Sequence, residues 1–134
     1  DCLITRLRTR GYQVVPKHSH SPINLEEYDF FIVSNFINMP EEVKESLYDR
    51  DYIIYEHDHK YLKNRNPSVF PDFKAPPHMI INEKFYRSAR AVFCQSNIHA
   101  EVARKNLSIR NVVNTGCSLW HNSQIATLRK TRWQ

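Results

Sequence analysis

Four ionisable side chains follow one another in the middle of the chain: Glu56, His57, Asp58 and His59. A carboxylate beside an imidazole can remove a proton from a hydroxyl group, because each group can orient the other. The sequence therefore predicts Asp58 or His57 as a general base. Glu56 and His59, on either side of this pair, are expected to bind the substrate.

The same run permits two other interpretations. On an extended backbone His57 and His59 share a face, so both could ligate a metal in a small metal-dependent hydrolase. A third ligand has no obvious sequence neighbour, and no metal is expected here. The purely structural interpretation is that one acid caps the next turn and that the histidines are solvated.

A long proline-rich segment follows, from Lys60 to Pro77. A loop of this length inside a compact domain is usually functional or disordered. Lys60, Lys63 and Arg65 are predicted to bind a phosphate or an anionic acceptor, with aromatic side chains between them stacking on a sugar or a base. The alternative is a solvated charged loop.

The elements around this run should place it at the edge of a sheet. The apolar run Tyr52–Tyr55 directly before Glu56 has the pattern of a buried strand. In an open α/β sheet, chemistry gathers just beyond the carboxyl ends of the strands. The polar run is therefore expected at a functional edge.

Two other predicted strands end in polar residues. His18 follows the first of them, at 12–15, and Ser34 and Asn35 follow the second, at 28–33. These three residues are predicted to bind substrate at the same edge. Residues of these types after a strand also serve as simple turn caps.

The periodicity of the whole chain alternates between helices and strands. Helices are expected at 1–10, 40–48, 78–90, 96–107 and 119–134, and strands at 12–15, 28–33, 52–55, 91–95 and 111–115. This order predicts an α/β fold, a single Rossmann-like domain with a mostly parallel sheet flanked by helices. Because the chain starts inside a helix, a first strand is expected to be missing. The bulky apolar run at 28–33 is typical of a sheet covered on both faces.

Composition limits the class of protein. The chain has 134 residues, enough for one domain, and a net charge of +5 that suits an anionic partner. Three scattered cysteines without a C-x-x-C pair indicate a reducing compartment, so a cytoplasmic location is expected. Only two glycines are present, which excludes a glycine-rich phosphate loop. No apolar run approaches the length of a membrane span.

Residues 28–120 resemble the N-terminal half of glycosyltransferases of the two-domain GT-B type. The similarity is strongest in FYRSARAVFCQSNIHAEVARKNLSIRNVVNTGCSLW, residues 85–120. There a helix leads into a strand that ends in Ser96, a second helix follows, and the last strand ends in a Gly-Ser-like turn at 116–118. The resemblance implies that 1–120 form the acceptor-binding domain of such an enzyme. Residues 121–134 would be a basic helical tail or the start of the interdomain linker.

The resemblance also implies what should lie outside this chain. A second Rossmann-like domain or chain would bind the nucleotide-sugar donor, so the present domain is expected to bind no cofactor itself. It would contact a sugar or glycan acceptor and be inactive in transfer when isolated. A homodimer is also possible where the missing domain would pack. The competing hypothesis is a non-catalytic module that binds nucleic acid or another polyanion through the loop 60–74.

Overall fold

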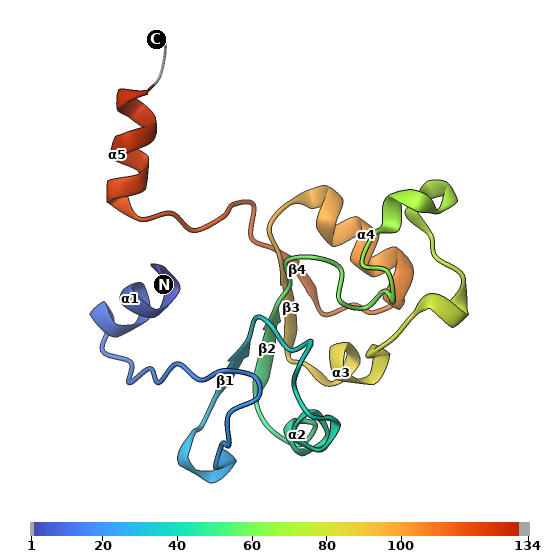
Figure 1. Ribbon diagram of the computed structural model, residues 1–134, viewed down its shortest axis with the longest axis horizontal. Helices are drawn as coiled ribbons and strands as arrows, with labels where there is room; N and C mark the ends of the chain where they lie inside the picture. The colour runs from blue at the N-terminus through green and yellow to red at the C-terminus, as the bar shows by residue number, and fades with distance from the viewer. Residues whose placement is uncertain (1, 132–134) are drawn as a thin grey trace. The chain divides into compact units, whose positions relative to one another are not determined.

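The computed structural model describes residues 2–131 and has an α/β fold with a parallel sheet of four strands among those residues (Figure 1). Asp1 and the end of the predicted tail, 132–134, lie outside the described residues. The strands are β1 (Phe31–Val33), β2 (Tyr52–Tyr55), β3 (Ala91–Cys94) and β4 (Val112–Asn114), and the helices are α1 (Cys2–Thr9), α2 (Glu41–Leu47), α3 (Glu83–Ser88), α4 (Asn97–Leu107) and α5 (Asn122–Lys130). The predicted fold class is confirmed.

The described chain divides into two compact units. One unit contains the sheet and spans His18–Gly116, and the other combines the two ends of the chain, with α1 and α5. In the terminal unit α1 ends at Thr9, and Gly11 in the turn that follows has a φ of +88°, which glycine adopts without strain. The sequence predicts one boundary, after residue 120.

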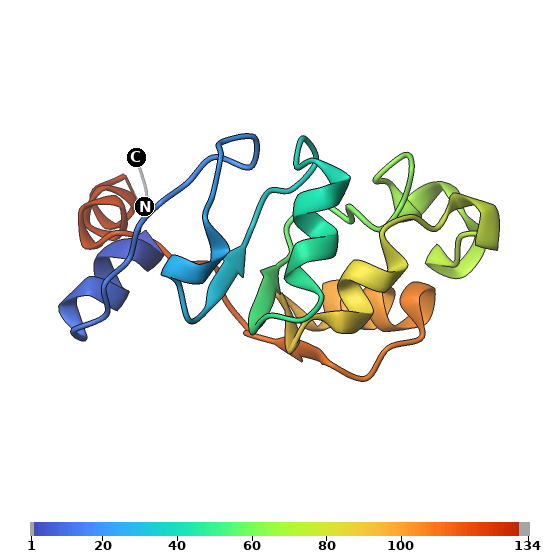
Figure 2. The ribbon, with the colours of Figure 1, turned by 90° about the horizontal axis from the view of Figure 1, so that it is seen from below.

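The strands of the sheet unit lie in chain order, and every neighbouring pair is parallel. Crossovers between parallel strands are right-handed, so an order that never reverses puts every crossover on the same face. Figure 2 shows α2, α3 and α4 together on one side of the strands. The four strands contain no reversal of order, which is the feature that creates a ligand crevice in doubly wound sheets.

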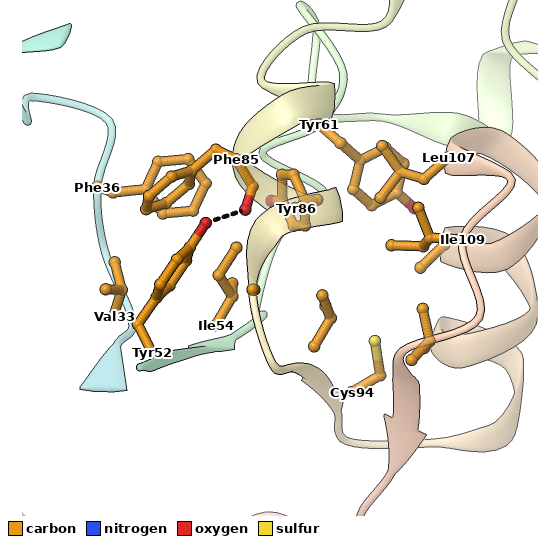
Figure 3. Packing of buried hydrophobic residues seen from close by; sticks show 14 of the residues in the cluster. Val33, Phe36, Tyr52, Ile54, Tyr61, Phe85, Tyr86, Cys94, Leu107 and Ile109 are labelled. Carbon is orange, nitrogen blue, oxygen red and sulfur yellow. Dashed lines mark hydrogen bonds between the residues drawn. The ribbon is translucent and has the colours of Figure 1, made fainter. Parts of the chain in front are cut away.

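The covered face of the sheet carries the core (Figure 3). Tyr52 stacks on Phe85 of α3 with ring centroids 5.0 Å apart, and its hydroxyl donates to the Phe85 carbonyl at 2.6 Å. Phe36 meets Phe85 edge-on, also at 5.0 Å. Aromatic pairs of this kind add to the free energy gained from burial. This packing fixes α3 against β2, the strand that leads to the polar run.

The opposite face of the sheet is not covered to the same degree. Its side chains alternate with the buried ones, and Ile32 of β1 and Val113 of β4 are 37% and 43% exposed. The expected burial on both faces is therefore not met at the two outer strands. The physical reason is the unidirectional strand order, which directs the crossovers of this unit to one side.

Two predicted elements differ from the structure. Residues 12–15 form no strand, and Tyr12 and Val15 are 64% and 53% exposed. The helix expected at 78–90 is reduced to Glu83–Ser88, preceded by a 3-10 turn at Pro77–Met79. Ile80 instead forms an isolated antiparallel bridge with Leu62, and the Ile81 amide donates to the Tyr61 carbonyl at 2.8 Å. These tertiary bonds override the local helical periodicity.

Candidate functional site

The polar run begins as a continuation of β2. The Glu56 amide donates to the Phe93 carbonyl of β3 at 2.9 Å, so the ladder extends one residue beyond Tyr55. Side chains alternate along a strand, and Glu56 thus shares the covered face with Tyr52 and Ile54. Glu56 is consequently fully buried, with no exposed surface.

The buried Glu56 carboxylate organises the turn that follows it. Its Oε1 atom accepts hydrogen bonds from the amides of His57 and Asp58, both at 3.0 Å, and from the amide of Lys60 at 3.4 Å. Lys60 Nζ lies 3.3 Å from the same oxygen, and the Tyr86 hydroxyl donates to Oε2. Burial alone would raise the pKa of Glu56, but Lys60, Tyr86 and the amides together lower it. Glu56 is therefore an ionised structural carboxylate.

Asp58 is held between two cations. Lys60 Nζ is 2.6 Å from Oδ1, and Arg65 Nη1 is 3.1 Å from Oδ2. Partial burial raises its pKa, but the two cations outweigh that effect and lower it. Oδ1 makes no hydrogen bond within the described residues, but its ion pair with Lys60 compensates the charge. A carboxylate stabilised in this way is a weak proton acceptor.

His57 points away from the core and is exposed. Its Nδ1 lies 3.4 Å from the Gln95 amide nitrogen, and its ring is 5.0 Å from the ring of Tyr55. Partial burial and the nearby charge of Lys60 lower its pKa, opposed by the neighbouring carboxylates. At neutral pH the imidazole is therefore uncharged, the form that accepts a proton.

His59 forms a pair with His99 and is less exposed than His57. Its Nδ1 is 2.6 Å from the hydroxyl of the fully buried Tyr61, and its ring lies 4.6 Å from that of His99 in α4. Burial and His99 lower the pKa of His59 to about 4. Burial raises the pKa of Tyr61, so the phenol keeps its proton and shares a hydrogen bond with His59 Nδ1. This bond occupies Nδ1 and leaves Nε2 of His59 for another partner.

A pocket of about 420 Å³ opens beside this pair. Its walls are the loop that starts at His59 and the first turn of α4. The Ser96 hydroxyl caps that helix by accepting a hydrogen bond from the His99 amide at 3.2 Å. The volume falls within the range of small-molecule sites. The lining residues that carry distinctive chemistry are His59, Arg65, Phe73, Ser96, Ile98 and His99.

A second hollow, of about 640 Å³, lies at the opposite edge of the sheet. Its lining includes Asp29 and Asp51, which precede β1 and β2, together with Glu26, whose carboxylate pairs with Arg50. It contains no histidine, cysteine or lysine among its described lining residues. The smaller pocket is therefore the better candidate, because convergent imidazoles and a cation line it.

The structure brings six of the ten predicted site residues into one cluster of contacts, and the other four lie apart. Ser34 and Asn35 are exposed beyond β1, with no hydrogen bond to the cluster within the described chain. His18 stacks on His20 at 5.7 Å, and Lys63 is an exposed residue whose amide donates to the Met79 carbonyl. The six clustered residues are Glu56, His57, Asp58, His59, Lys60 and Arg65.

Sequence reasoning did not identify Tyr86, Gln95, Phe73 or His99 as members of this region. His99 lies three residues after the Ser96 cap, at the carboxyl end of β3, and β3 neighbours β2 in the sheet. That position was a usable signal, because neighbouring parallel strands end at one edge. Tyr86 had no such signal, since only tertiary packing brings α3 over Glu56.

The geometry gives little support to the two competing sites. Lys60 is only 3% exposed and is committed to Glu56 and Asp58, so it is not a surface cation for a polyanion. Lys74, at the other end of the loop, donates to the Lys105 carbonyl. Within residues 2–131, no group of three or more histidine, cysteine or acidic side chains is placed to hold a metal ion.

None of the helices within the described part of the chain is long and apolar enough to cross a membrane.

Comparisons with known proteins identify no relative of this chain. The chain matches no protein-family model, no curated protein and no solved structure.

Proposed function

We propose that this chain is the acceptor-binding part of a glycosyltransferase of the two-domain type. The observation that carries the proposal is the uncharged, exposed His57 next to Asp58 at the carboxyl end of β2, on the same edge as the pocket beside His59. Such an edge can hold a hydroxylated acceptor and accept its proton. The resemblance of residues 28–120 to GT-B enzymes supplies the reaction class.

Within this proposal His57 is the general base. Its imidazole is uncharged at neutral pH and accessible, whereas the lowered pKa of Asp58 makes that carboxylate the weaker acceptor. Asp58 orients the acceptor or stabilises the imidazolium that forms after proton transfer. Glu56 and Lys60 are positioning residues, because they fix the turn and are themselves buried.

The nucleotide-sugar donor would be held by another domain or chain. Its sugar would approach the acceptor hydroxyl after His57 removes the proton, and the leaving group would be a nucleoside diphosphate. The present domain contributes acceptor binding, orientation and proton removal. A polyanion-binding module is the weaker candidate, because Lys60 is internal and paired with Glu56 and Asp58.

The test combines binding with transfer. The isotope-labelled chain is titrated with a panel of methyl glycosides, and amide chemical shifts are followed by NMR. We expect shifts at residues 57–59 and at 96–99, and none at the acidic hollow near residue 49. The gene product that carries this chain with its donor half is then assayed for release of nucleoside diphosphate.

In that assay His57→Gln should lower kcat by about 10²- to 10⁴-fold, the usual contribution of a general base. Acceptor binding should change little. His18→Gln is the matched control, since His18 is exposed and has no contact with the cluster in the described structure. Equal activity of both variants would contradict the proposal. So would glycoside-induced chemical-shift changes that are confined to other surfaces.

A further inference from the structure

Three residues of the pocket have an unusual backbone conformation. His59, Arg65 and Phe73 have φ values of 55°, 53° and 58°, in the left-handed region that residues other than glycine seldom adopt. These residues supply an imidazole, a cation and an aromatic ring. Strained backbone of this kind persists where surrounding structure enforces it and is concentrated at ligand-binding sites.

Local hydrogen bonds enforce that conformation. The Leu62 amide donates to the His59 carbonyl at 2.9 Å, and the Phe73 amide donates to the Phe70 carbonyl at 3.0 Å. Asn106 of α4 reaches across and donates to the Phe73 carbonyl at 2.8 Å. The loop is therefore fastened to the fold on both sides of the pocket, and its side chains are held in place before any ligand arrives.

The charged side of the pocket is cationic. Arg65 is the ionised side chain among the described lining residues, and none of those residues is acidic. One guanidinium nitrogen of Arg65 bonds to Asp58, which leaves further donors of its planar fork for another acceptor. Tyr61 occupies Nδ1 of His59, so the tautomer protonated at Nε2 adds a second donor.

A further polar atom in this region lacks a partner. The Nε2 atom of His99 is buried and has no hydrogen bond within the described structure, although a buried polar atom normally finds one. His99 lies against His59 and lines the same pocket.

Two of the lining residues are large, apolar and open to solvent. Phe73 is 48% exposed and Ile98 is 71% exposed, although both side chains are large. An aromatic face next to a small set of convergent polar groups suits a ring-shaped ligand with a polar edge. The volume of about 420 Å³ accommodates a single sugar ring with its substituents.

From these features we infer that the pocket binds a sugar ring that carries an anionic group, either a carboxylate or a phosphate. The anion lies against Arg65 and the Nε2 proton of His59, and the ring packs on Phe73. The inference rests on the proposed function, since it names the chemical class of the acceptor. It adds a discrimination that the general acceptor site does not require, namely preference for acidic over neutral sugars.

The experiment measures dissociation constants of glucuronate, glucose 6-phosphate, glucose and inorganic phosphate at pH 7 and constant ionic strength. Charge-assisted hydrogen bonds to arginine should make at least one acidic sugar bind about tenfold more tightly than glucose. The better of the two acidic sugars identifies the anion. Arg65→Gln should abolish the preference, and Phe73→Ala should weaken all three sugars.

Lys63→Gln is the matched control for charge, because Lys63 is an exposed cation of the same loop that does not line the pocket. It should preserve the preference. Equal binding of acidic and neutral sugars overturns the inference and leaves the proposed function in place. Phosphate that binds as tightly as glucose 6-phosphate also overturns it, because the ring then contributes nothing. If no sugar binds, both proposals fall.

Discussion

The turn after β2 serves two different purposes on its two sides. On the inner side Glu56 and Lys60 are buried, mutually paired and bonded to the backbone. On the outer side His57 and Arg65 are exposed, and each has one polar partner and unused bonding capacity. The comparison teaches that residue type alone does not mark a site, because a buried acid can be structural while its neighbours are available for chemistry.

Removing Glu56 should have the largest effect on the inner side. Glu56→Gln leaves a buried cation and three amides with a weaker acceptor, and the loss of one member of a buried ion pair costs about 3 kcal/mol or more. Urea denaturation measures the change. The control is Glu83→Gln, which removes an exposed ion pair with Arg87 and should leave stability unchanged within error. Similar losses for both variants would contradict the structural role of Glu56.

Tyr86→Phe should have the next largest effect. It deletes the hydroxyl that donates to Glu56 Oε2 and leaves that buried oxygen with fewer partners, at a cost of about 2 kcal/mol. Tyr55→Phe is the comparison, since Tyr55 lies on the open face with its ring near His57. Thermal unfolding of the two variants should separate them clearly. Equal stability of both would indicate that Glu56 does not depend on Tyr86.

Acidification should lower the stability of the fold through the histidines, His59 above all. The pKa of His59 falls from 6.5 in a free chain to about 4 in the fold, so the unfolded chain binds a proton more readily over this interval. Stability should therefore decrease as pH falls from about 6.5 to about 4. Allowing for partial exposure of the ring, the loss is about 1 to 2 kcal/mol.

Denaturation at pH 7 and pH 5 measures that dependence. The lowered pKa values of His57 and His99 act in the same direction, and the lowered pKa of Glu56 adds a further loss at more acidic pH. His59→Gln should flatten the slope, and His78→Gln should not. A stability that rises on acidification would reverse the assignment of His59 as a buried neutral base.

The smallest expected effect concerns backbone strain. At Phe73, with φ of 58°, glycine should be more stable than alanine by about 1 kcal/mol. At Val69, an exposed residue of the same loop without a positive φ, alanine should instead be more stable than glycine. There glycine relieves no strain and only raises the conformational entropy of the unfolded chain. Chemical denaturation of the four variants gives the comparison. The same order at both positions would remove the strain argument.

Local pattern predicted all four strands of the sheet, together with a fifth at 12–15 that the structure does not contain. The strand at Tyr52–Tyr55 has the predicted bounds, and the helix expected through Leu107 begins at Asn97 after a Ser96 cap. Both have clear local signals, an apolar run and a capping residue. Residues 12–15 show the limit of such signals, because apolar character makes a strand only where a neighbouring strand supplies hydrogen bonds.

The candidate site was predictable in position but not in detail. The carboxyl end of β2 was identified from the apolar run before it, and the cluster of six residues lies there. Glu56 lies two residues after Ile54 and four after Tyr52, so the three side chains share one face of the strand. The burial of Glu56 follows once that face is known to be the covered one. The partners from α3 and α4, Tyr86 and His99, depend on packing between segments far apart in the chain.

The strand order also determines where the sheet opens first under native conditions. β1 and β4 have three residues each and bond to one neighbour, whereas β2 and β3 are bonded on both sides. Amide hydrogen exchange should therefore be fastest at the outer strands and slowest at the central pair. Glu56 is bonded to Phe93 at the end of this slow pair. The site can thus keep its geometry while the edges of the sheet open and close.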